Sequence, residues 1–127
     1  MFHIQSPRTD DASVEQMIKD KGKIAPRVTP ADLEAVIASE WYFTAGDGCH
    51  AVQTNGSPGE PSHYDSALDL LTFCVLVLKN GFTVTGESAC ASPENFDAEI
   101  GRKVARENAK QKLWPLLGYE LKSKLAI

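Results

Sequence analysis

The chain has few cysteines and no long apolar segment. Its three cysteines, Cys49, Cys74 and Cys90, are an odd number with no CxxC spacing, which argues against a disulfide framework or a zinc ribbon. The longest apolar run, residues 73–78, is far shorter than the roughly 18 residues needed to cross a bilayer. The first residues lack the charged flank and apolar centre of a secretory signal. We therefore expect a cytoplasmic protein with reduced cysteines and no membrane association.

Positive charge is absent from the middle of the chain. Residues 29–69 carry seven acidic side chains and no lysine or arginine, whereas residues 70–127 carry eight basic and six acidic ones. A phosphate-binding surface needs local positive charge to displace counterions, so any nucleic-acid contact is confined to the C-terminal third. No glycine-rich phosphate loop of either standard pattern is present, which disfavours nucleotide hydrolysis.

The first third of the chain predicts an arm, a short helix and a short strand. Residues 1–28 are polar with few aromatics, and we interpret them as a flexible N-terminal arm that can hold a short helix. Thr29, Pro30 and Asp32 then supply a capping hydroxyl, a proline at the first helical position and acid in the first turn. The aromatic run at residues 41–44 predicts a brief strand after this helix.

Residues 45–66 are rich in glycine, proline, serine and asparagine, which predicts a long loop. Loops of this length in a small domain are often functional. The loop contains His50, His63 and Asp65, which would form a metal site or a small enzyme's site if their side chains converged. No histidine and carboxylate pair has helical ligand spacing, however. We therefore assign no catalytic residue, no metal and no cofactor, and keep an enzyme as an alternative.

The clearest predicted element is a β-hairpin. Residues 70–78 are apolar and rich in β-branched side chains, and residues 82–89 form the returning strand. Between them, Asn80 and Gly81 are the residue pair that tolerates the two positive φ angles of a type I′ turn. A two-residue turn would fix how the two strands pair.

That pairing predicts one core face and one uncovered face. The turn would place Val77 opposite Val84, and the core face would then be formed by Phe73, Val75, Val77, Phe82 and Val84. The other face would carry Leu76 and Leu78 opposite threonines. Because this face is half apolar, we expect Leu76 and Leu78 to need a partner.

A long C-terminal helix is predicted after the hairpin. Ser92, Pro93 and Glu94 repeat the start signal seen at Thr29. The apolar row of this helix consists of Phe96, Ile100, Val104, Ala105, Ala109, Leu113, Leu116 and Leu117. Pro115 is expected to kink or end the helix, and Gly118 is a suitable terminator.

Together these elements predict an α+β fold in the order α-β-β-β-α. A chain of 127 residues with 43% hydrophobic residues can bury one core. We expect residues 29–127 to form a single domain with a long loop at 45–66. A short helix, a small antiparallel sheet built on the hairpin, and a long C-terminal helix packed on one face would make up this domain.

The same order occurs in double-stranded-RNA-binding domains, and the last helix carries Arg102, Arg106 and Lys110. Those domains place lysines at the amino end of the final helix, where this chain has acidic residues. Acid at the start and base later also complement the helix dipole, which needs no ligand. Nucleic-acid binding through this basic face is therefore a disfavoured alternative.

Two stretches of the chain carry a family resemblance. The first is residues 28–45, and the second runs from residues 71–90, which include Asn80-Gly81-Phe82-Thr83-Val84-Thr85-Gly86-Glu87, on to residues 100–109. They resemble small tailed-bacteriophage proteins grouped as the phage gene-49/gene-66 family, over about two thirds of the chain. The resemblance implies a bacteriophage or prophage accessory protein in the host bacterial cytoplasm. It implies no activity and no catalytic residues.

These observations favour a non-enzymatic phage accessory protein for host takeover or counter-defence. We expect it to bind a host protein or a small host signal molecule during infection, and to form a homo-oligomer. The candidate binding residues are two aromatic residues that can stack a ligand, two leucines of the uncovered hairpin face and three cations: Trp41, Tyr42, Leu76, Leu78, Arg102, Arg106 and Lys110.

Overall fold

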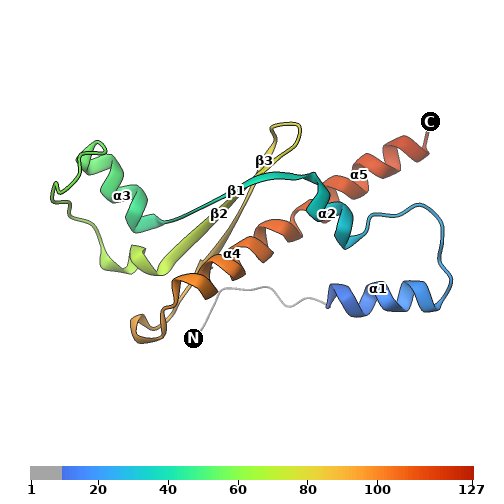
Figure 1. The fold of residues 1–127 in the computed structure, drawn as a ribbon, viewed down its shortest axis with the longest axis horizontal. Coiled ribbons are helices and arrows are strands. Elements are labelled where there is room, and N and C mark those ends of the chain that lie inside the picture. The colour runs from blue at the N-terminus through green and yellow to red at the C-terminus, as the bar shows by residue number, and fades with distance from the viewer. Residues whose placement is uncertain (1–9) are drawn as a thin grey trace.

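Helices and strands mix along the chain, and the α+β class is confirmed (Figure 1). The computed structural model describes residues 10–127. The helices are α1 (Asp11–Asp20), α2 (Pro30–Val36), α3 (Ala45–Thr54), α4 (Ala98–Gln111) and α5 (Leu113–Leu125). The strands are β1 (Ile37–Thr44), β2 (Leu71–Leu78) and β3 (Thr83–Ala89), and short 3-10 turns η1 (Ser66–Leu70) and η2 (Pro93–Asn95) precede β2 and α4.

The three strands form one antiparallel sheet in the order β1-β2-β3. Helix α4 packs along β2 and β3, while α2 lies beside β1 and α3 lies beyond one end of the sheet (Figure 1). The core between the sheet and the helices consists of Leu33, Cys74, Leu76, Leu78, Val84, Ala105, Ala109 and Leu113. A long C-terminal helix on one face of a hairpin-based sheet is therefore confirmed, with α3 added between the first two strands.

Helix α4 approaches β3 more closely than most helices approach a sheet. A Cβ atom added to Gly86 would lie 2.2 Å from the backbone nitrogen of Ala109 and 2.3 Å from the carbonyl oxygen of Ala105. The buried side of α4 is formed by Gly101, Ala105 and Ala109. Ile100, predicted to be buried, is 44% exposed. Small residues rather than large apolar ones therefore make the contact with the sheet.

The hairpin turn differs from the prediction. Gly81 has a φ of +88°, but Asn80 is not left-handed, so the turn is not type I′. The amide of Gly81 donates to the carbonyl of Leu78, and the amide of Leu78 donates to the carbonyl of Phe82, each at 2.8 Å. Residues 79–81 thus form a three-residue loop with a glycine at its left-handed position, a second turn that Asn-Gly can make.

One extra loop residue shifts the pairing of the strands. Val84 lies opposite Leu76, and Val77 lies opposite Thr83. Because alternate side chains of a strand point to opposite faces, this shift brings the other set of β2 side chains, which includes Leu76 and Leu78, to the face of Val84. Leu76 and Leu78 are 0% and 5% exposed, so the prediction that they lie on an uncovered face is wrong.

Helix α3 replaces the first half of the predicted loop. The hydroxyl of Thr44 accepts from the amide of Asp47, and the Asp47 carboxylate accepts from the amide of Thr44 at 2.8 Å. Such a capping box satisfies two backbone donors at the helix start. The prediction of a loop over residues 45–66 is therefore wrong at residues 45–54. The same pattern at Thr29 and Asp32 begins α2, as predicted.

The C-terminal helix starts later than predicted and has two segments. Ser92 makes no side-chain cap, and the Asp97 carboxylate instead accepts from the amide of Ile100, so α4 begins at Ala98. The helix is interrupted after Gln111, shortly before Pro115, as we predicted from the position of this proline. Its second segment, α5, continues through Gly118, so the prediction of a terminator there is wrong.

Helix α1 supplies the short helix expected within residues 1–28. It is capped by Asp10 and buries no residue completely. Glu15 pairs with Arg27, and Gln111 of α4 donates to Asp11 at 3.3 Å. The flexibility of the arm stays a prediction, and residues 1–9 lie outside the described part of the chain.

The outer edges of the sheet are partly occupied by side chains. The side-chain amide of Asn108 on α4 donates to the carbonyl of Glu87 at 2.8 Å. In an antiparallel pair, alternate residues direct their backbone groups away from the partner strand, and this carbonyl belongs to the outward set. On β1 the amide of Thr44 is likewise taken by Asp47. Neither edge therefore presents a complete row of free backbone groups.

Candidate functional site

The face of the sheet opposite α4 is the candidate site. Along β2, every second residue from Thr72 to Leu78 is buried under the helices, while the residues between them are only half-buried. The strand pairing places Trp41 beside Val75 and Phe43 beside Phe73. We call this the open face, formed by Trp41, Phe43, Phe73, Val75, Val77, Thr83 and Thr85. Within residues 10–127, the helices cover the other face.

The open face has an aromatic ridge along β1. Trp41 is 62% exposed and Phe43 is 42% exposed. The indole of Trp41 donates to the hydroxyl of Ser39 at 3.0 Å, and the rings of Phe43 and Phe73 lie 5.6 Å apart between centroids. These contacts hold the ridge in place before any ligand arrives. A contiguous exposed apolar surface of this kind is typical of a protein interaction site.

Trp41 is on the open face, but its neighbour Tyr42 is not. Tyr42 packs against the core, and its hydroxyl donates to the Glu40 carboxylate at 3.1 Å. Burial, with the neighbouring Cys74 and the bond to Glu40, raises the pKa of Tyr42. The two aromatic residues therefore point to opposite sides of the sheet and do not form one stacking site.

Four apolar residues of the open face were missed as candidates: Phe43, Phe73, Val75 and Val77. The sequence assigned Phe73, Val75 and Val77 to the core because the two-residue turn gave the wrong register. A three-residue turn places all three with Trp41. The signal was therefore present in the alternation of the strands, and only the register was missing.

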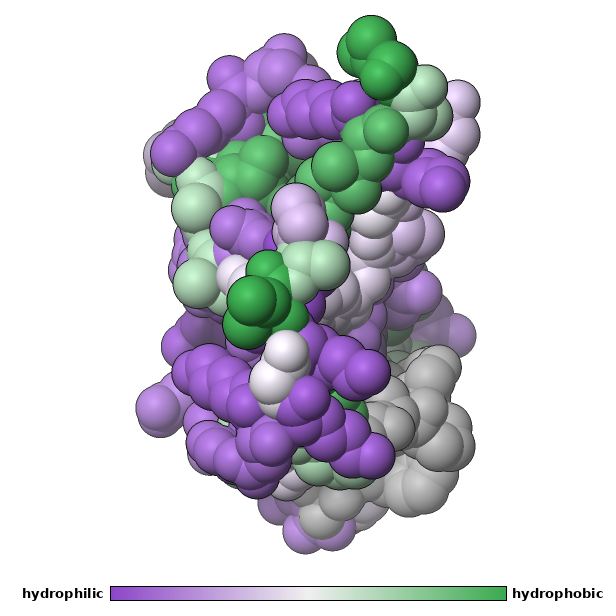
Figure 2. All heavy atoms as spheres, turned by 90° about the vertical axis from the view of Figure 1, so that its right-hand side faces the viewer, coloured by the Kyte–Doolittle hydropathy of each residue, from purple (hydrophilic) through white to green (hydrophobic). Residues whose placement is uncertain are grey.

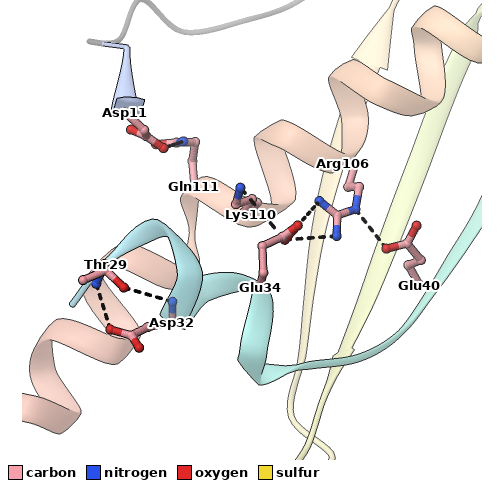
Figure 3. A network of polar contacts seen from close by, with 8 residues as sticks. All are labelled: Asp11, Thr29, Asp32, Glu34, Glu40, Arg106, Lys110 and Gln111. Carbon is pink, nitrogen blue, oxygen red and sulfur yellow. Dashed lines mark hydrogen bonds and ion pairs between the residues drawn. The ribbon is translucent and has the colours of Figure 1, made fainter. Parts of the chain in front are cut away.

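Two of the three predicted cations have acidic partners (Figure 3). Arg106 lies 3.1 Å from the Glu34 carboxylate and 2.9 Å from that of Glu40, and Lys110 lies 3.9 Å from Glu34. Burial acts to lower the pKa of Arg106, but its bonds to the two glutamates raise it. Arg102 is exposed and makes no ion pair within residues 10–127. The structure thus breaks up the basic face that the sequence predicts.

The histidines at the α3 end of the molecule have separate partners. His50 lies 2.6 Å from the hydroxyl of Ser62, and the amide of His63 donates to Gln53 at 2.7 Å. The Asp65 carboxylate accepts from the amide of Ala67. In the described part of the chain, no group of three His, Cys, Asp or Glu side chains is placed to hold a metal ion. These contacts fasten residues 55–65 to α3.

A second apolar area lies at the other end of the molecule. Figure 2 shows it at the upper end of the view, where the hairpin tip and α5 lie. It includes Phe82, 55% exposed, and Leu116, 39% exposed, which both line a cavity of about 220 Å³. Charged side chains of α5 interrupt this area, among them Glu120 and Lys124.

Comparison with known proteins places this small α+β protein in a family. A family model described as phage protein (N4 Gp49/phage Sf6 gene 66) matches residues 28–125. The chain belongs to this phage protein family. No curated protein and no solved structure matches it. Within residues 10–127, no helix has the length and apolarity to span a membrane.

Proposed function

We propose that this phage accessory protein binds a host protein in the bacterial cytoplasm through its open face. The observation that carries the proposal is the exposed ridge of Trp41 and Phe43 on a face over which no helix of residues 10–127 lies. Tryptophan at the centre of an interface is among the residues that contribute most to binding energy. Family membership supports a role in phage infection.

The chemistry of the open face favours a protein over a nucleic acid. None of its seven residues is basic, and Glu87 lies beside Phe73 at its border. Nucleic-acid affinity depends on lysine and arginine near the phosphates. Arg106 and Lys110, two of the three cations considered for nucleic-acid binding, are already paired with Glu34.

Its shape favours a protein over a small molecule. Small-molecule sites are concave and enclose most of the ligand surface. A three-stranded sheet face is nearly flat, and its apolar side chains stand out from it. A cavity of about 800 Å³ lies elsewhere, between α1 and α4, and is lined mainly by polar and charged residues such as Asp11, Glu15 and Lys19.

A pull-down from bacterial lysate tests the proposal. The immobilised protein is compared with Trp41→Asp and with Val52→Asp, a matched control on α3 where Val52 is 82% exposed. A host protein should be retained by the native chain and by the control but lost with Trp41→Asp, because a charge would then be buried in the interface. Equal retention by all three proteins would contradict the proposal. So would a small molecule, identified by mass spectrometry, that is lost with Trp41→Asp while no protein is.

A further inference from the structure

We infer that this protein binds a small zwitterion of the α-amino-acid type, such as alanine, at the end of the sheet away from the hairpin tip. A cavity of about 100 Å³ lies there, where β1 and β2 meet the first turns of α3 and α4 (Figure 1). The inference does not depend on the host partner, because it follows from the chemical groups around this cavity.

The cavity borders a buried hydroxyl that lacks a partner. Thr72 of β2 lines the cavity and is 3% exposed, and its Oγ1 atom has no hydrogen-bond partner within residues 10–127. A Cβ added to Gly101 would lie 3.0 Å from this oxygen and 3.9 Å from the ring of Phe96, which also lines the cavity. The hydroxyl therefore faces the space beside Phe96. Because this ring is only half-buried, a small shift of it lets a ligand reach the oxygen.

An unpaired hydroxyl of this kind is unusual. Buried polar groups nearly always have a hydrogen-bond partner, and leaving one without a partner destabilises the fold. No side chain or backbone group of the described chain supplies a partner to Thr72. A ligand in the cavity would supply it.

The α4 side of the cavity suits a carboxylate. Arg102 lines it, is exposed and makes no ion pair in the described part of the chain. Ala98, the first residue of α4, lines it too, and the first amides of a helix have no partner in the helix and favour anions. A guanidinium group binds a carboxylate through two parallel hydrogen bonds. This side therefore offers a cation and a helix start to one anionic group.

The α3 side of the cavity suits an ammonium group. One oxygen of the Asp47 carboxylate accepts from the amide of Thr44 at 2.8 Å, which leaves the other oxygen for a ligand. Asp47 and Arg102 line the same cavity, so an anion alone would meet the charge of Asp47 and a cation alone would meet that of Arg102. A molecule that carries both charges is attracted by both side chains.

The volume of the cavity limits the ligand to a small amino acid. A cavity of about 150 Å³ holds benzene, a molecule of six heavy atoms. A space of about 100 Å³ takes a molecule of that size or smaller, and alanine also has six heavy atoms. Tyr42 and Phe96 give its methyl group an apolar contact. Because so small a molecule makes few contacts, we expect a dissociation constant in the millimolar range.

Titration with alanine, followed by two-dimensional amide NMR spectra, tests the inference and locates the ligand. The amides of Thr72, Ala98 and Arg102 should shift on binding. Propionate is alanine without its ammonium group, and ethylamine is alanine without its carboxylate. Each should bind at least about tenfold more weakly than alanine, because each leaves one charge of the lining without a partner.

Two charge variants test the two sides of the cavity. Arg102→Gln should weaken alanine binding at least about tenfold, while Lys103→Gln, the matched control on α4, should leave it unchanged because Lys103 does not line the cavity. Asp47→Asn keeps an oxygen for the amide of Thr44, so α3 stays capped. It should weaken the binding of alanine but not that of propionate.

Thr72→Val tests the buried hydroxyl. It keeps the shape of the side chain and removes a polar group without a partner, so the melting temperature of the protein without alanine should not fall. Alanine binding should nevertheless weaken, because the hydrogen bond to the ligand is lost. A purely structural role of Thr72 would not separate these two measurements.

Several outcomes would overturn the inference. They are the absence of amide shifts at alanine concentrations on the order of 100 mM, equal affinity of Arg102→Gln and Lys103→Gln, and full affinity of Thr72→Val. Propionate or inorganic phosphate that binds as tightly as alanine would show a simple anion site instead. Trp41→Asp should bind alanine like the native chain, so this test and the lysate experiment can fail separately.

Discussion

Replacing Gly86 with alanine is expected to destabilise the protein by at least about 3 kcal/mol, the upper part of the range for overpacked cores. The new methyl group would lie 2.2 Å from the backbone nitrogen of Ala109, against 3.4 Å or more for ordinary contact. A flexible side chain could rotate away, but a helix backbone cannot. Helix α4 would have to retreat from β3 by more than about 1 Å, which would loosen the packing around Ala105 and Val84.

Urea unfolding followed by circular dichroism measures this loss, which should also lower the melting temperature by about 10 °C. Gly48→Ala is the matched control, because Gly48 lies inside α3 and an added Cβ there would touch nothing within 4 Å. That variant should gain roughly 0.5–1 kcal/mol from helix propensity alone. If Gly86→Ala is as stable as the native protein, the close approach of α4 to the sheet is refuted.

Three further predictions concern caps, charges and the turn. Thr44→Ala should cost about 1 kcal/mol and speed amide hydrogen exchange in α3, because it removes half of the capping box; unchanged exchange would count against the box. Arg106→Gln should lower the free energy of unfolding by only about 1 kcal/mol at pH 7, because both glutamate partners of Arg106 are well exposed. The bond to Arg106 lowers the pKa of Glu40 in the folded protein. The stability difference between the native protein and Arg106→Gln should therefore be present above the unfolded glutamate pKa of about 4.3 and vanish as pH falls through the lowered pKa of folded Glu40. A stability difference that persists in strong acid would refute this reasoning. Gly81→Ala should cost about 1 kcal/mol or more, because φ is +88° there, and Gly81→Asn should recover part of that loss in urea unfolding; equal losses would argue against the left-handed turn.

Elements with strong local signals were predictable from the sequence. The cap at Thr29, the hairpin and the long amphipathic helix were recognised because each depends on a few neighbouring residues. Helix α3 was missed because Gly46 and Gly48 are typical of turns. Gly46 has a different role here, since a Cβ on it would lie 2.1 Å from the Asp69 carboxylate. A close tertiary contact of this kind leaves no mark in the local sequence.

The candidate site depended on a single unresolved choice in the sequence. Asn80 and Gly81 suit both a two-residue and a three-residue turn, and the two differ by one residue in register. That residue decides whether Leu76 or Val75 faces the helices. The helix positions that face the sheet, Gly101 and Ala105, are small. Only the structure shows that they face Thr72 and Gly86, and so which side of the hairpin is covered.

The side chains bound to the sheet edges affect how copies of this protein can accumulate. Strands that join edge to edge offer a new edge each time, so that mode of association grows into fibres without limit. Asn108 occupies the carbonyl of Glu87 at one edge, and Asp47 occupies the amide of Thr44 at the other. An incoming strand would have to displace both. These two bonds therefore oppose edge-to-edge growth of the sheet.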